Sequence, residues 1–157
     1  MCCALRRPAA VGGDVAEKIG LIQTGGIGDI VIALPIADYF IEAGHEVVWP
    51  VRESNFKIFR ETAPQVNFLS VTQDDRGQAY DTPMQMLREQ NCGQIFCLYS
   101  YLEKHDVTNK SLACSLKFDE YKYAIAGVPF ERKWKLQLQR NPQRPPVAFC
   151  GSLIVKT

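Results

Sequence analysis

The chain has 157 residues, of which 46% are hydrophobic and 22% charged, a composition typical of one soluble globular domain and not of a disordered segment. The formal net charge of +1 excludes a global field that would attract nucleic acid or acidic lipid, so we expect no nucleic-acid partner. No apolar stretch approaches the ~20 residues that span a bilayer, and the sequence therefore predicts no transmembrane segment.

The first residues and the cysteines bear on the compartment. Residues 1–17 hold two adjacent glycines and no apolar periodicity, so we expect a flexible leader without a secretory signal. The six cysteines form no C-x-x-C pair, which favours reduced thiols over a disulfide framework or a metal site. The sequence thus predicts a cytoplasmic protein with no metal site, either free in the cytoplasm or at the inner face of the membrane.

Strands and helices alternate from residue 18 onward. Residues 19–22 form an apolar run that ends at a glycine-rich turn, which is typical of a buried strand. Over residues 30–41 apolar side chains recur at every third or fourth position and predict a helix. Pro35 lacks the N–H that would pair with the carbonyl of Val31, so we expect a kink or a break there. Residues 46–51 predict the second strand.

The pattern continues through the middle of the chain. Ser54 is expected to cap a short helix, and residues 66–71 to form a third strand. Thr82 is expected to cap a helix whose first position is Pro83, and residues 95–98 to form a fourth strand. Strands that alternate with helices predict an α/β fold: a Rossmann-like three-layer domain with a mostly parallel sheet.

The last third of the chain is less regular. Residues 118–126 predict a further helix, and the alternation of apolar and polar residues over 134–138 predicts one exposed strand. We expect one domain over residues 18–140, with residues 141–157 forming a linker and tail.

The most informative segment is the glycine-rich loop between the first strand and the first helix. Three glycines in four positions let the backbone turn sharply and bring bare N–H groups toward a ligand. In doubly wound sheets, ligands bind at the carboxyl ends of the strands. A tight turn that requires positive φ is the structural alternative. The predicted ligand-binding residues of the loop are Thr24, Gly25, Gly26, Ile27 and Gly28.

Two common phosphate-binding loops fit this segment poorly. The dinucleotide fingerprint G-x-G-x-x-G has Val31 in place of its third glycine, although Glu53 stands where an acidic partner of a ribose would be expected. A P-loop is excluded because no lysine and hydroxyl residue end the loop. A nucleotide-cofactor domain of the NAD type therefore remains an alternative.

Asp29 follows the loop and has two interpretations. A carboxylate in the first turn of a helix commonly interacts with the helix dipole, which contributes ~0.3–1 kcal/mol. The other interpretation is a general base that accepts the proton of a sugar hydroxyl.

The segment KIGLIQTGGIGDIVIALPIADYF resembles the opening of the bacterial lipopolysaccharide heptosyltransferases, with the G-x-x-GD loop at Gly25 to Asp29 followed by an apolar helix with an early proline, Pro35. The segments AGHEVVWPV and KFDEYKYAIAGVPFERKWKL stand where this family has its second strand and the approach to its interdomain link. The resemblance implies one half of a GT-B fold, namely the half that binds the acceptor, a sugar or lipid-linked glycan. It also implies that Asp29 is the catalytic base of an inverting transfer from a nucleotide sugar.

The family's second half, which binds the nucleotide-sugar donor, has no counterpart in this sequence, because residues 147–157 are too few to form it. The sequence is then that of a truncated product, an excised domain or half of a split enzyme. We expect no cofactor on this chain, a donor bound by a partner domain, and no transfer by this chain alone.

Other residues give weaker signals. His105, in the loop after the fourth strand, is a further candidate for acceptor binding. The basic residues around Trp134 are those of either a phosphate- or RNA-binding patch or, as we expect, a solvated strand. A glycan-binding module without catalysis is the remaining alternative for the whole chain.

Overall fold

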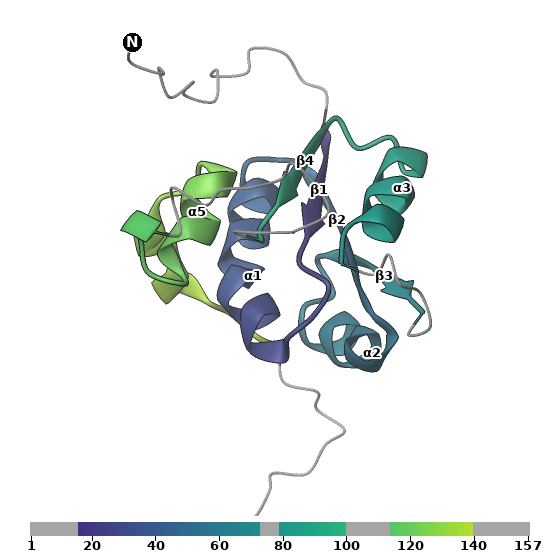
Figure 1. Ribbon diagram of the computed structural model, residues 1–157, viewed down its shortest axis with the longest axis horizontal. Coiled ribbons are helices and arrows are strands. Elements are labelled where there is room, and N and C mark those ends of the chain that lie inside the picture. The colour runs from purple at the N-terminus through teal and green to yellow at the C-terminus, as the bar shows by residue number, and fades with distance from the viewer. Residues whose placement is uncertain (1–15, 73–78, 100–113, 140–157) are drawn as a thin grey trace, which may run out of the picture.

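The computed structural model describes residues 16–72, 79–99 and 114–139 (Figure 1). Its centre is a four-stranded sheet in the order β3-β2-β1-β4, in which each neighbouring pair is parallel. This confirms the expected α/β, Rossmann-like three-layer fold with a parallel sheet. The strands are β1 (Lys18–Ile22), β2 (Glu46–Arg52), β3 (Asn67–Val71) and β4 (Gln94–Cys97).

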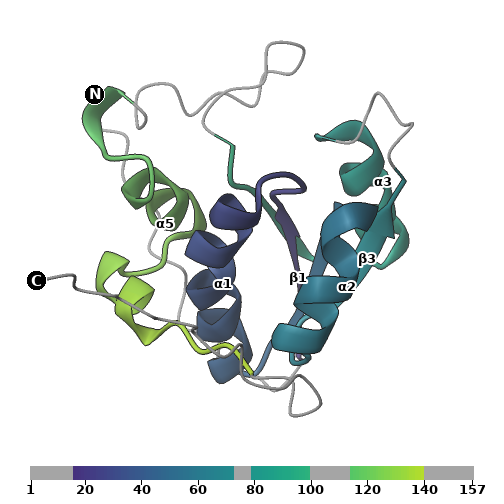
Figure 2. The ribbon, with the colours of Figure 1, turned by 90° about the horizontal axis from the view of Figure 1, so that it is seen from below.

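Helices cover both faces of the sheet. Side chains of α1, α2 and α5 pack in one apolar cluster on one face of the sheet. α3 packs in a second cluster on the opposite face. Both views place α1 between α5 and β1 (Figures 1 and 2). The helices are α1 (Ile27–Glu42), α2 (Glu53–Thr62), α3 (Asp81–Glu89), α5 (Glu120–Ala126) and the 3-10 helix η1 (Phe130–Lys135).

Burial on both faces explains the nearly continuous apolar sequence of the two inner strands. Four of the five residues of β1 and five of the seven residues of β2 are buried. α3 approaches β1 so closely that a Cβ added at Gly20 would lie 2.8 Å from a methyl carbon of Leu87. A larger residue at position 20 would therefore have to displace the Leu87 side chain.

The two inner strands stay in contact beyond their paired residues. β1 and β2 pair from Lys18–Glu46 to Gly20–Val48, and Pro50, which has no N–H to give, follows two residues later. The Trp49 indole donates to the carbonyl of Gln23 at 3.2 Å, and the Arg52 N–H donates to the carbonyl of Thr24 at 3.1 Å. These contacts fix the direction in which the chain leaves β1.

Two expected helix caps and the expected break in the first helix are wrong. α1 runs without interruption from Ile27 to Glu42, so no break occurs near Val31, and a kink there stays a prediction. Tyr123 donates its hydroxyl to the neighbouring carbonyl of Ile32 at 2.8 Å, and six buried residues hold the helix to the sheet. Because β2 leads directly into α2, Ser54 lies inside the helix and not at its cap. α3 begins at Asp81, one residue before the expected cap Thr82.

The exposed strand expected around Trp134 is also wrong. Phe130–Lys135 forms the 3-10 helix η1, and residues 136–139 have no regular structure. A strand needs a neighbour for its backbone hydrogen bonds, and this segment packs on α1, away from the sheet. At its end, the Gln139 N–H donates to the carbonyl of Thr62 at 2.8 Å.

Several expectations fall outside the described residues. These are the leader up to residue 15, the tail from residue 140 and the candidate His105. None of the helices in the described part of the chain is both long and apolar enough to cross a bilayer. Within the same residues, no group of three or more His, Cys, Asp or Glu side chains is placed to hold a metal ion.

Candidate functional site

The glycine-rich loop lies at the carboxyl end of β1, as the sequence predicts, and leads directly into α1. Thr24 and Gly25 are buried, whereas Gly26, Ile27 and Gly28 are exposed. The loop therefore presents backbone to solvent at the start of a 16-residue helix, where unpaired N–H groups and the helix dipole favour negative charge.

The three glycines differ in what their positions require. Gly26 has φ 75°, and a Cβ there would overlap the carboxylate of Asp29. At Gly25, a Cβ would lie 3.1 Å from the guanidinium carbon of Arg52. Gly28 has ordinary helical backbone, and a Cβ there would meet nothing within 4 Å. Neither backbone conformation nor packing therefore explains the third glycine.

Asp29 stands in the first turn of α1 and forms an ion pair that the sequence did not predict. Its Oδ1 lies 3.3 Å from Nζ of Lys122, which is in α5. The lysine side chain is 1% exposed and the aspartate side chain 28% exposed. The pair thus joins a buried cation to a carboxylate at the rim of the loop.

Lys122 is fully partnered in its buried position. Besides Asp29, its ammonium donates to Oε1 of Gln23 at 2.8 Å and to the carbonyl of Leu98 at 3.4 Å. It also lies 4.8 Å from the ring centre of Phe118 and 5.1 Å from that of Tyr121. Three acceptors match the three donors of an ammonium group, which is what a buried lysine requires.

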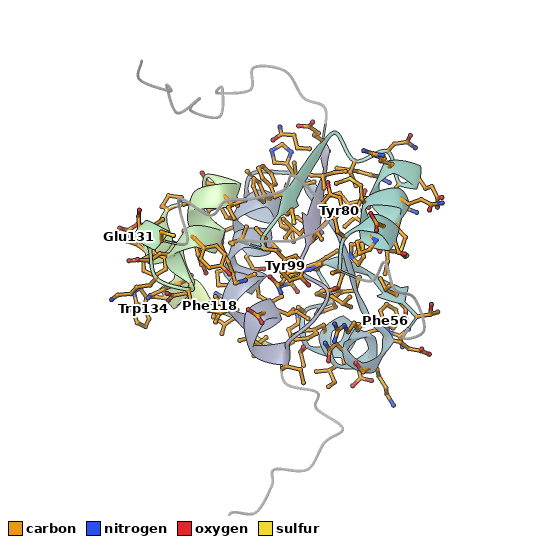
Figure 3. The ribbon with its side chains drawn as sticks, viewed as in Figure 1. Phe56, Tyr80, Tyr99, Phe118, Glu131 and Trp134 are labelled. Carbon is orange, nitrogen blue, oxygen red and sulfur yellow. The ribbon has the colours of Figure 1, made fainter. Side chains whose placement is uncertain are left out.

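The loop is further bonded to Tyr99, which follows β4, and to the last residue of β2. The Tyr99 hydroxyl lies 3.1 Å from both the backbone N and Oγ1 of Thr24, and Figure 3 shows this tyrosine near the middle of the molecule. The Arg52 N–H donates to the carbonyl of Thr24 at 3.1 Å. Gln23 completes the network, because its Nε2 donates to the carbonyl of Gly25 at 3.1 Å. Hydrogen bonds with Tyr99, Arg52 and Gln23 thus hold the loop backbone in place.

Of the candidates named from the sequence, the loop residues 24–28 and Asp29 lie together at the end of β1. Sequence reasoning missed Lys122 and Tyr99, which lie 99 and 75 residues from their partners in the loop. A signal for the lysine existed. It stands four residues before the buried Ala126, on the apolar face of a helix, where a charge needs a buried partner.

Comparisons with protein-family models, with curated proteins and with solved structures find no match for this chain. The resemblance to heptosyltransferases therefore stays an interpretation of residues 18–140.

The arrangement offers one chemical capability above all. A carboxylate held through Oδ1 by a buried ammonium keeps a fixed position while remaining accessible beside exposed loop backbone. Such a group can accept a hydrogen bond, or a proton, from a hydroxyl that binds over Gly26 to Gly28.

Proposed function

We propose that this chain is the acceptor-binding half of an inverting sugar transferase in which Asp29 is the general base. The observation that carries this proposal is the ion pair between Asp29 and the buried Lys122, beside the exposed part of the loop. The pair satisfies the buried lysine and at the same time fixes the Asp29 carboxylate beside the exposed loop. A catalytic carboxylate has to be held in one orientation.

In the proposed reaction, a sugar or a lipid-linked glycan binds at the loop as the acceptor. Its hydroxyl oxygen attacks the anomeric carbon of a nucleotide sugar. The new glycosidic C–O bond forms as the C–O bond to the nucleotide phosphate breaks. The nucleotide leaves with the bonding electrons, and Asp29 takes the hydroxyl proton. The backbone N–H groups at the start of α1 orient the acceptor.

The donor requires its own site, which we assign to a second, donor-binding half. Bringing donor and acceptor together is a large part of such catalysis, because effective molarities of positioned reactants are high. The 157-residue chain is therefore expected to show no measurable transfer by itself. Measurable transfer by the purified chain alone would contradict this part of the proposal.

The decisive experiment joins the chain to the donor-binding half of a GT-B glycosyltransferase and compares turnover of the fusion with that of its Asp29→Asn variant. Asparagine keeps the shape but accepts no proton, so turnover should fall by ~10²–10⁴-fold. Asp119→Asn is the matched control, because Asp119 also pairs with a lysine, Lys133, but belongs neither to the loop nor to the first turn of α1. Normal turnover of Asp29→Asn would refute the general base.

The stability of Asp29→Asn has to be measured on the same samples. The variant leaves the buried Lys122 with two neutral acceptors, so we expect a loss of ~1–3 kcal/mol. A binding assay separates the alternatives. Tight binding of NAD by the chain alone would favour a nucleotide-cofactor domain. Glycan binding that Asp29→Asn leaves unchanged, in a fusion without turnover, would favour a non-catalytic module.

A further inference from the structure

A second concave surface lies at the other end of α1. It is a groove of about 640 Å³ between the last turns of α1 and residues 134–139. At ~1.5 Å per residue, Glu42 in this groove is roughly 20 Å along the helix from Asp29. The groove is therefore separate from the loop at the end of β1.

Trp134 forms one wall of this groove and is 80% exposed. Figure 3 shows it at the outer edge of the molecule, on the side of α5. The Lys133 ammonium lies 4.7 Å from the centre of the indole. Leu136, which is also exposed, lines the same groove, so Trp134 is not an isolated apolar residue on the surface. Exposed apolar surface that is rimmed by polar residues is typical of a binding site.

The other walls carry hydrogen-bonding groups. Asp38 Oδ1 accepts from Nε2 of Gln65 at 2.8 Å, and Glu42 pairs with Arg132. A carboxylate has about four lone-pair sites and a primary amide both donates and accepts, so these groups keep bonding capacity. Gln137 and Gln139 also line this groove.

This combination of groups selects one class of ligand. A pyranose ring has a C–H face that stacks on an indole and hydroxyls around its edge that pair with carboxylates and amides. The groove holds charges of both signs, because Lys135 lines it beside Asp38 and Glu42 and Arg132 pairs with Glu42, so the lining has no net preference for an anion such as phosphate and suits a neutral ligand. The centre of a protein interface is usually depleted of charged residues. The polar lining therefore argues against a protein partner as the occupant.

We propose that this groove binds a neutral oligosaccharide, with a sugar ring on Trp134 and its hydroxyls on Asp38 and Gln65. The Gln139 N–H on the Thr62 carbonyl holds the far end of the segment in place, so the groove exists before the ligand arrives. This site does not depend on Asp29, and it stands or fails independently of the transferase activity.

The two tryptophans of the chain allow a direct test, since Trp49 is fully buried and Trp134 exposed. The 157-residue protein is titrated with maltohexaose, cellohexaose and mannohexaose up to roughly 10 mM. At least one should change the emission of Trp134 and protect it from acrylamide. Trp134→Ala should abolish the change, and Asp38→Ala should weaken binding by about tenfold or more, read by calorimetry.

Ile58→Ala is the matched control, because Ile58 is also an exposed apolar residue but lies on α2, outside the groove. It should bind as the unaltered chain does. Failure of all three sugars to affect Trp134 overturns the proposal. Concentration-dependent self-association that Trp134→Ala abolishes, seen by sedimentation without sugar binding, would assign the surface to a protein contact and overturn it equally.

Discussion

The end of β1 and the segment after α5 contain the same kinds of side chain in opposite surroundings. At the end of β1, Trp49 is fully buried and Lys122, paired with Asp29, is 1% exposed. In the outer segment, residues 130–139, Trp134 is 80% exposed, and the paired side chains of Lys133 and Asp119 are 25% and 29% exposed. The two aspartates are almost equally exposed, at 28% and 29%, whereas the lysines and the tryptophans differ in their exposure to solvent.

The difference determines what each group contributes. Removing a buried polar group leaves its partners without water, which is costly, whereas an exposed ion pair contributes little because solvent screens it. We therefore infer that the end of β1 is held rigidly, as a base or a binding loop requires. The exposed side chains of the outer segment contribute little to the free energy of unfolding, so they can serve in binding without loss of stability.

Exchanging the two tryptophans for alanine should give the largest contrast in stability. Trp49→Ala removes a buried indole and its hydrogen bond to the Gln23 carbonyl, and should cost ~3–5 kcal/mol. Trp134→Ala should change the free energy of unfolding by no more than ~0.5 kcal/mol. Urea denaturation of both variants measures the two values. A loss above ~2 kcal/mol for Trp134→Ala would mean that the outer segment is part of the core.

The two lysines give the next contrast. Lys122→Met leaves Gln23 Oε1 and the Leu98 carbonyl without their donor, although Asp29 keeps some contact with water. We expect a loss of ~2–4 kcal/mol. Lys133→Met, the same change in a pair whose lysine is partly exposed, should cost no more than ~1 kcal/mol. Equal losses in urea denaturation would show that burial does not set the strength of these pairs.

Two glycines of the loop should respond to substitution by alanine in opposite directions. Gly26→Ala should destabilise by ~1–3 kcal/mol, because φ is positive and the new methyl meets the Asp29 carboxylate. Gly28→Ala should stabilise by ~0.4–1 kcal/mol, because its helical backbone and open surroundings accept alanine. If the loop binds an acceptor, Gly28→Ala should weaken acceptor binding despite the gain in stability. Thermal melting gives both signs, and a destabilised Gly28→Ala would contradict the reason given.

The same comparison explains how far sequence alone could lead. Apolar periodicity predicted the four strands and the helices because burial on one or both faces imposes it, and the carboxyl end of β1 follows from the fold class. The partner of Asp29 could not be predicted, since Lys122 meets it only through the packing of α5 beside α1. The alternation of apolar and polar residues around Trp134 predicted a strand wrongly, because an exposed segment without a neighbouring strand has no face to bury.

The smallest expected effect is a difference in pH dependence between two carboxylates near the outer segment. Burial raises the pKa of Asp38, although hydrogen bonding by Gln65 opposes the shift. For Asp119, desolvation also acts to raise the pKa, but hydrogen bonds from Lys133 and from backbone N–H groups outweigh it, and the pKa is lowered. The two groups should therefore change stability in opposite directions as they ionise.

A raised pKa means that the folded state binds the Asp38 proton more tightly than the unfolded state does. Its contribution is therefore complete below the unfolded pKa of about 3.9 and is lost as the pH rises through the folded pKa. For Asp119 the contribution is present above about pH 3.9 and is lost as the pH falls through the folded pKa.

Urea denaturation of Asp38→Asn and Asp119→Asn from roughly pH 2.5 to 7 tests both signs. Relative to the unaltered chain, Asp38→Asn should gain stability as the pH rises, and Asp119→Asn should lose it. Parallel pH profiles would mean that burial and the Lys133 contact do not separate these two carboxylates in solution.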